Sequence, residues 1–166
     1  MVISSAGFLT EDIKRVVREQ RLAYVATVCP DGTPNLSHKG TMTVWDDDHL
    51  VFADIRSPGT VSNLKANPAI EINVVDIFLR KGYRFKGTGT VLTEGPLFEQ
   101  AMQLFRDQVE RADERIRSVV LVKVDLALPI TSPGYDLGLT EDEMKEKWRR
   151  YYDSLESDRA IEPASE

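Results

Sequence analysis

The chain changes its hydrophobic spacing several times. A helical stripe is followed by extended runs that are separated by turn sequences. In the stripe, Thr10 can cap the helix, and Ile13, Val16 and Val17 share one face. The extended runs are rich in β-forming residues, and Pro-Asp-Gly turn chemistry connects the first two. The first half therefore predicts one helix and three strands, at residues 10–20, 22–28, 34–45 and 50–53.

The second half mixes both kinds of spacing. A capping box formed by Thr140 and Glu143 marks the start of the last helix, in which Met144, Trp148 and Leu155 share a face. The remaining segments predict a short helix, two strands, a helix and a strand, at residues 58–67, 70–74, 83–92, 98–109 and 119–128.

Helices are too few for a doubly wound parallel sheet, so we expect a mainly β protein with peripheral helices, built on an antiparallel barrel. Residues 1–157 are expected to form a single domain, with the barrel in residues 10–130 and a C-terminal loop and helix in 131–157. Residues 158–166 are expected to form a polar tail.

Composition removes several classes of function. The net charge of −6 argues against nucleic-acid binding, which depends on neutralising phosphates. No apolar run approaches the roughly 18–20 residues that cross a bilayer, and residues 1–7 do not resemble a signal peptide. The single cysteine, Cys29, has no partner for an internal disulfide, so a soluble cytoplasmic protein is expected. With only His38 and His49 as histidines, no metal site is expected.

One constellation points to chemistry. A polar run at residues 37–43 interrupts an extended segment, and residues 54–63 then join a strand end to a helix start. The free N–H groups and the dipole at such a helix start favour an anion. A phosphate could therefore bind at Ser57, Gly59 and Thr60, with Arg56 as its countercharge and Lys39 nearby. An ordinary capped helix after an ordinary hairpin would explain the same residues, so the pattern alone leaves both interpretations open.

A resemblance favours the first interpretation. The runs Leu22–Val28, Asp31–Pro34, Leu50–Asp54, Asn63–Pro68 and Arg84–Val91 resemble, in order and spacing, the pyridoxamine 5′-phosphate oxidase-like family of FMN-binding split barrels. The resemblance implies a six-stranded antiparallel split β-barrel, a homodimer, and flavin mononucleotide (FMN) bound at the subunit interface. It places the cofactor cradle within residues 38–65. The residues expected to bind FMN are His38, Lys39, Gly40, Thr41, Asp54, Arg56, Ser57, Thr60 and Asn63, with Lys81, Gly82 and Arg84 contributed by the opposite subunit.

The chain also departs from the family pattern. Gly59 and Thr60 stand where the family often has an Arg-Lys phosphate clamp, and Thr43 stands where the oxidases hold the substrate phosphate with a lysine. The C-terminus lacks their terminal arginine. These differences argue against pyridoxamine 5′-phosphate oxidase activity itself.

The resulting prediction is an FMN-dependent oxidoreductase acting on a small molecule, with catalytic residues unassigned. A positive group, Lys39 or His38, is expected to stabilise the reduced flavin. Trp148 either packs in the core or covers the flavin. A flavin carrier without turnover, and a relative that binds the deazaflavin F420 or haem, remain the alternatives.

Overall fold

The computed structural model describes the backbone of residues 9–161 and the side chains of residues 9–157. Seven strands form one antiparallel sheet in the order β2-β1-β5-β6-β7-β4-β3. The strands are β1 (Ala23–Val28), β2 (Pro34–Lys39), β3 (Thr43–Val44), β4 (His49–Asp54), β5 (Ala69–Asp76), β6 (Lys81–Leu92) and β7 (Ser118–Thr131). The helices are α1 (Glu11–Gln20), α2 (Pro58–Ala66), α3 (Pro96–Arg106), α4 (Ala112–Arg115) and α5 (Glu141–Ile161), and a 3₁₀ turn, η1, covers Pro133–Tyr135.

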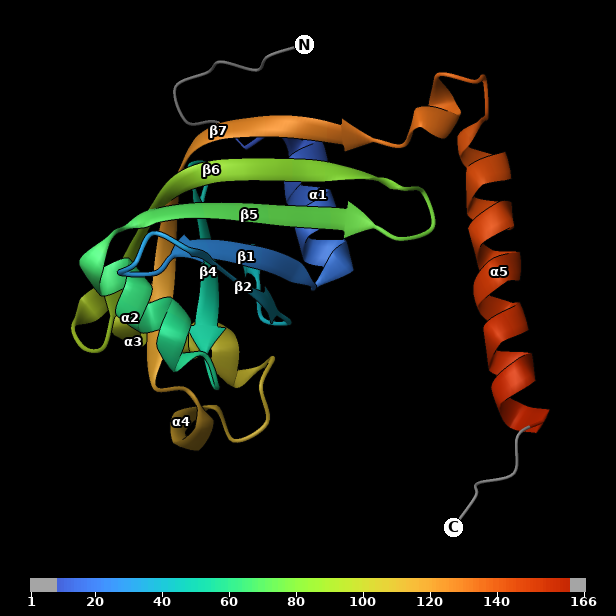
Figure 1. Cartoon of the computed structure of the whole chain (residues 1–166). Coiled ribbons are helices and arrows are strands. Elements are labelled where there is room, and N and C mark those ends of the chain that lie inside the picture. Colours follow the sequence, from blue (N-terminus) through green and yellow to red (C-terminus); the bar gives the residue numbers. More distant parts are fainter. Residues whose placement is uncertain (1–8, 162–166) are drawn as a thin grey trace.

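The sheet curls into a half-barrel (Figure 1). Its long strands β6 and β7 change register between Lys86 and Gly87. A Cβ atom at Gly87 would lie 2.1 Å from the carbonyl oxygen of Lys123, so only glycine permits this close approach. Because a bulge of this kind bends the strands, it helps the sheet to curve round, and the expected split-barrel fold is confirmed.

One predicted strand is two. The run expected over 34–45 divides into β2 and β3, which raises the strand count from the predicted six to seven. The intervening turn at Gly40–Thr41 lets the Thr41 hydroxyl bond Ala53 N at 3.0 Å and Ala53 O at 3.3 Å. At the turn, the Thr41 side chain thus takes the place of backbone hydrogen bonds to β4. Hydrophobic spacing does not predict such a tertiary contact.

Two apolar clusters hold the fold together. The larger one fills the barrel beneath α1, where Ile13, Phe52 and Phe85 are fully buried. The smaller one packs α3 and α4 against the other face of β4 and β7, around Phe105 and Val119. Fully burying one such side chain contributes about 1.5–3 kcal/mol, so these clusters are the main source of stability.

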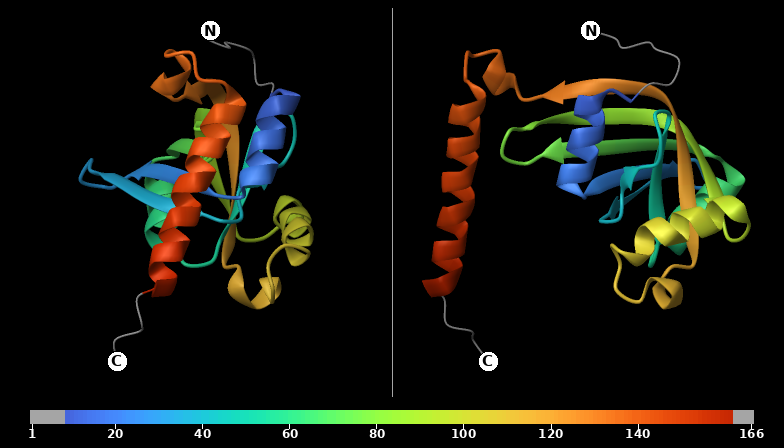
Figure 2. Two further views of the ribbon diagram at one scale, coloured as in Figure 1. Left: turned by 90° about the vertical axis from the view of Figure 1, so that its right-hand side faces the viewer. Right: turned by 180° about the vertical axis from the view of Figure 1, so that it is seen from behind.

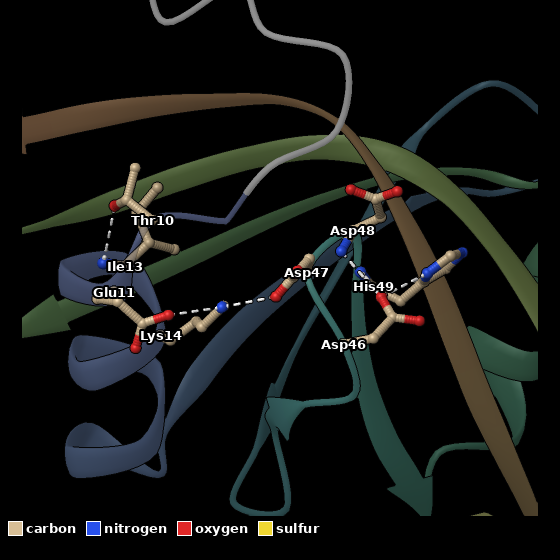
Figure 3. Close-up of polar contacts among 8 residues, drawn as sticks. All are labelled: Thr10, Glu11, Ile13, Lys14, Asp46, Asp47, Asp48 and His49. Carbon is tan, nitrogen blue, oxygen red and sulfur yellow. Dashed lines mark hydrogen bonds and ion pairs between the residues drawn. The ribbon is translucent and has the colours of Figure 1, made fainter.

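Charged side chains fix the start of α1 to the β3–β4 turn (Figure 3). Thr10 caps the helix by accepting a hydrogen bond from Ile13 N at 3.3 Å. Lys14 Nζ lies 2.7 Å from carboxylate oxygens of both Glu11 and Asp47. In the turn, Asp46 accepts hydrogen bonds at 2.8 Å from the backbone N–H groups of Asp48 and His49. We call Glu11, Lys14, Asp46, Asp47 and His49 the rim cluster.

The C-terminal helix stands clear of the sheet, beyond the tip of the β5–β6 hairpin, and runs across the direction of these strands (Figures 1 and 2). The predicted capping box is confirmed, since Thr140 N donates to Glu143 Oε2 at 2.8 Å and Glu143 N donates to Thr140 Oγ1 at 3.3 Å. The backbone of α5 continues to Ile161, four residues into the segment expected to be a tail. Residues 162–166, and residues 1–7 of the signal-peptide prediction, lie outside the described residues. Among the described helices, none is long and apolar enough to cross a membrane.

Candidate functional site

Strand β2 presents two different faces at the site. Its pairing with β1 sets Ser37 opposite Val25 and His38 opposite Tyr24. Because successive side chains alternate across a sheet, Ser37 and Lys39 point inward while His38 points outward. Lys39 is accordingly buried, with 4% of its surface exposed, although it ends an edge strand.

Helix α2 begins directly beside this strand end. Ser57 is its N-cap residue, Pro58 follows in the first turn, and no acidic residue occupies that turn. Asp54 Oδ1 accepts a hydrogen bond from Ser57 N at 2.8 Å, which fixes the chain as it enters the helix. The first N–H groups of a helix have no intrahelical acceptor, and the helix dipole is positive there, so this end favours an anion.

A groove of about 450 Å³ opens between β2, the end of β4 and the start of α2. This volume lies within the range of small-molecule sites, roughly 300–1,000 Å³. We call it the cradle groove. Its lining residues are Ser37, His38, Lys39, Gly40, Thr41, Ala53, Ile55, Arg56 and Ser57.

Lys39 is the most informative residue of the cradle groove. Its Nζ donates hydrogen bonds to Ser37 Oγ at 2.6 Å, to Ser57 Oγ at 2.9 Å and to the His38 carbonyl oxygen at 3.4 Å. All three acceptors are neutral, and within residues 9–157 the ammonium makes no ion pair. Burial lowers the pKa of Lys39, and the negative charge of Asp54 opposes that shift. An ammonium held in this way is stabilised by any anion that enters the groove.

Arg56 adds a second positive charge at the groove. Its side chain is exposed, and it forms no ion pair in the part of the chain that the structure describes. The cradle groove therefore combines two cations, the Ser57 hydroxyl and a helix N-terminus. This donor set matches a phosphate monoester, so the residues present fit the phosphate end of FMN.

Three predicted residues support the groove without lining it. Thr60 and Asp54 are buried, and the Thr60 hydroxyl lies 3.0 Å from Ser37 Oγ, where it orients the serine that Lys39 uses. Asn63 is buried further along α2, where it donates to Thr27 Oγ1 at 3.1 Å.

Lys81, Gly82 and Arg84 lie at the start of β6 and do not line the cradle groove of the same chain. A Cβ at Gly82 would lie 2.0 Å from Val74 O, so this glycine allows two strands to approach closely. Arg84 pairs with Glu71 at 2.6 Å on the outer face of the sheet. Their contact with a cofactor of the opposite subunit stays a prediction.

Ser37 lies in the polar run 37–43 but is not among the residues expected to bind FMN, and the sequence does not predict Ala53 or Ile55 in the groove. The position of Ser37 was predictable, because it lies two residues before Lys39 on the same strand and therefore on the same face. Ala53 and Ile55 carry no such signal, since they meet the groove only through the pairing of β4.

Trp148 lies outside both apolar clusters. The guanidinium carbon of Arg80 lies 3.6 Å from the centroid of its ring, and its Nε1 donates to Met144 Sδ at 3.2 Å. The core-packing prediction is therefore wrong, because Trp148 lies at the tip of the β5–β6 hairpin. Within the same chain Trp148 does not line the cradle groove, and its predicted role in covering the flavin stays a prediction.

Comparisons with known proteins show the family and the fold of the chain. No curated protein matches the chain. HupZ from Group A Streptococcus is 31% identical over 75% of this chain and 95% of its own, with a TM-score of 0.67. An FMN-binding protein from Syntrophomonas wolfei is 17% identical over 74% of this chain and 86% of its own, with a TM-score of 0.62.

The same fold occurs in proteins described by other ligands. An F420 reductase is 23% identical over 72% of this chain and 98% of its own, with a TM-score of 0.57. HutZ, a haem storage protein from Vibrio cholerae, is 20% identical over 73% of this chain and 94% of its own, with a TM-score of 0.57. The family model for pyridoxamine 5′-phosphate oxidase matches residues 9–128. The chain therefore belongs to the pyridoxamine 5′-phosphate oxidase-like family of FMN-binding split barrels.

Proposed function

We propose that this protein binds FMN in the cradle groove and acts as a flavin-dependent oxidoreductase on a small molecule. One observation carries the proposal: a buried lysine at a helix N-terminus has only neutral partners within a groove large enough for a ligand. Burying an unpaired ammonium is costly, and a structure that accepts this cost is best explained by an anion that binds there.

The positions of the groove residues suggest a division of roles. Lys39 and Ser57, together with the first turn of α2 and Arg56, hold the phosphate. FMN, when bound, supplies the electron-transfer chemistry. Because Lys39 is engaged at the phosphate end, His38 is the better candidate for the positive group expected near the flavin ring.

We also propose that the working form is a homodimer in which the outer face of β2, β1, β5 and β6 meets a second copy. In that arrangement Lys81, Gly82 and Arg84 of one copy would approach the cofactor of the other. The proposal is supported by Tyr24 and Leu36, large side chains that are 51% and 67% exposed on this face.

The alternatives differ in ligand or turnover. A flavin carrier would use the same phosphate contacts without a substrate pocket. F420 also carries phosphate, so the cradle groove does not discriminate against it. Haem receives less support from the site, because His38 is the only histidine at the groove and His49 Nδ1 lies 2.8 Å from Asp46 Oδ1.

A titration of purified protein tests the proposal. We expect FMN to bind one per chain, with quenching of flavin fluorescence, and riboflavin, which lacks the phosphate, to bind at least tenfold more weakly. Lys39→Met should remove most of that difference, whereas Lys14→Met, in the rim cluster, should leave it intact. Equal affinity for FMN and riboflavin would contradict the phosphate assignment. If FMN binds but flavin reduced in the holoprotein is not reoxidised by any small-molecule acceptor, the carrier alternative is favoured.

A further inference from the structure

Helix α5 is an addition to the family barrel. The family match ends at residue 128, and HupZ is covered over 95% of its own length while leaving a quarter of this chain unmatched. Within the described residues, no helix or strand of the barrel packs along α5. The first half of the helix is held at the tip of the β5–β6 hairpin and by η1, as far as Tyr152, whose ring centroid lies 5.8 Å from that of Phe78.

The anchoring contacts are specific. Lys81 Nζ lies 2.7 Å from Glu141 Oε1, and the Tyr135 hydroxyl donates to Leu79 O at 2.6 Å. Arg80 stacks on Trp148. These contacts fix the direction of α5, so the helix is a rigid projection and not a loose tail.

A second groove, of about 620 Å³, separates α5 from the outer face of the sheet. We call it the outer groove. Four of the seven exposed large hydrophobic side chains among the described residues line it, namely Leu22, Tyr24, Leu36 and Ile77. Tyr152 lines it from α5, beside Tyr151, whose ring centroid is 5.4 Å away and which is 49% exposed. Tyr152 packs on Phe78 of its own chain, whereas Tyr151 and the four exposed side chains of the sheet face stay uncovered within the described residues.

Length and charge indicate what covers them. The 21 residues of α5 span about 30 Å, more than the roughly 20 Å across the strands from β2 to β7. The outer groove is lined by Arg80 and Arg84 against a single acid, Glu71, which pairs with Arg84 at 2.6 Å. The segment from Tyr151 to Ser157 carries Asp153 and Glu156 without a base. The helix therefore complements this sheet face in polarity and charge, yet its anchored start keeps it from lying on the face of its own chain.

We propose that α5 is a dimerisation arm, whose apolar side packs on the outer sheet face of a second copy while the partner's arm packs reciprocally. A two-fold arrangement satisfies both apolar surfaces with one kind of contact. Because His38 lies on this same face, the partner's arm also borders the cradle groove. The inference rests on the homodimer in the proposed function and is independent of which ligand the cradle groove takes.

Complementation between two full-length variants tests the arm. Light scattering should give wild-type protein a mass of twice 18.7 kDa. Tyr151→Asp spoils the arm and Leu36→Asp spoils the face, and each variant alone should shift at least tenfold toward monomer. A mixture of the two should regain dimer, because the heterodimer keeps one intact arm-to-face contact and each homodimer keeps none. Leu137→Asp, at a residue that is 85% exposed outside the outer groove, is the control and should stay dimeric.

The possible failures are distinguishable. Monomeric wild-type protein would overturn both the arm and the homodimer. A dimer that is insensitive to Tyr151→Asp would overturn the arm and leave the homodimer standing. Two monomeric variants that do not complement each other would place the contact within one chain, which also overturns the arm. Loss of FMN binding with the dimer intact would concern only the cradle groove.

Discussion

Two lysines of this protein sit in opposite environments. Lys14, in the rim cluster, lies 2.7 Å from two carboxylates, and these contacts raise its pKa (Figure 3). Lys39, in the cradle groove, is surrounded by hydroxyls and a carbonyl, and burial lowers its pKa. The first charge is matched within the chain and serves to hold α1 on the β3–β4 turn. The second is matched only in part, by the charge of Asp54.

The difference separates structural from ligand-binding polarity. Surface ion pairs such as those of Lys14 contribute little to stability and serve to fix geometry. A buried cation without a counterion costs stability, so its presence needs another reason. Lys39 therefore lowers the stability of the ligand-free protein and raises its affinity for an anionic ligand. The ion pairs of the rim cluster have no such effect.

The largest expected effect is on ligand affinity. Lys39→Met should weaken FMN binding about 10- to 100-fold, because a charge-assisted hydrogen bond contributes about 1.5–3 kcal/mol. Isothermal titration calorimetry of the variant and of Lys14→Met would measure this. An equal loss in both variants would erase the distinction between the two lysines.

The same substitution should stabilise the ligand-free protein. Replacing a buried, unpaired ammonium by an apolar side chain of similar length should raise the free energy of unfolding by about 1 kcal/mol at pH 7. Urea denaturation followed by circular dichroism would measure it. A destabilised Lys39→Met protein would show that the hydroxyl contacts already compensate the charge.

The hydroxyl network beneath Lys39 should contribute next. Thr60→Val keeps the side-chain shape but leaves Ser37 Oγ without its partner at 3.0 Å, so we expect a loss of about 1 kcal/mol in the free energy of unfolding. Thr90→Val, on the exposed part of β6, is the matched control and should change stability by less than about 0.5 kcal/mol. Similar losses in both variants would indicate that strand propensity, and not the network, decides the outcome.

The free energy of unfolding should depend on pH in opposite ways through Lys39 and through Tyr83, which is hydrogen-bonded to Asp12 of α1. The pKa of Lys39 is lower in the folded chain than the ordinary 10.5, so the unfolded state binds more protons below 10.5 and this residue makes stability rise with pH. Tyr83 behaves oppositely. Burial and its 2.5 Å hydrogen bond to Asp12 raise its pKa from 10.0 to about 12, so its contribution is lost as pH rises from 10 to 12.

Denaturation series in alkaline buffers would resolve the two contributions. Lys39→Met should remove the rising component, and Tyr83→Phe should remove the falling one. Tyr24→Phe, at a side chain that is 51% exposed on β1, is the control for Tyr83. Parallel curves for wild type and Lys39→Met would show that the lysine is solvated in the folded state.

The smallest effect is expected at the rim cluster. Lys14→Met should lower the melting temperature slightly at low ionic strength, and the loss should shrink in 0.5 M salt because surface charges are screened. Thermal melts at two salt concentrations would measure it. A salt-independent loss would show that the aliphatic stem of Lys14, and not its charge, stabilises the contact with Asp47.

Most of the fold was predictable because it depends on local spacing. The stripe of Ile13, Val16 and Val17, the β-rich run before Cys29 and the capping box at Thr140 each produced the expected element near its expected bounds. The split of the second strand was not predictable, because the turn at Gly40 is stabilised by Ala53, a residue distant in sequence. Helix α5 exceeded its predicted end because its polar last turns carry no stop signal.

The sequence by itself determined which residues form helices and strands, the family of the barrel, and the identity of the polar segment that faces the cradle groove. Tertiary structure alone decided that Lys39 is buried among hydroxyls while Thr60 and Asn63 turn away from the groove. It alone also decided that Trp148 serves an anchor outside the core. The physical reason is that spacing reports which face a side chain takes within its own element, whereas burial and charge compensation depend on which elements meet that face.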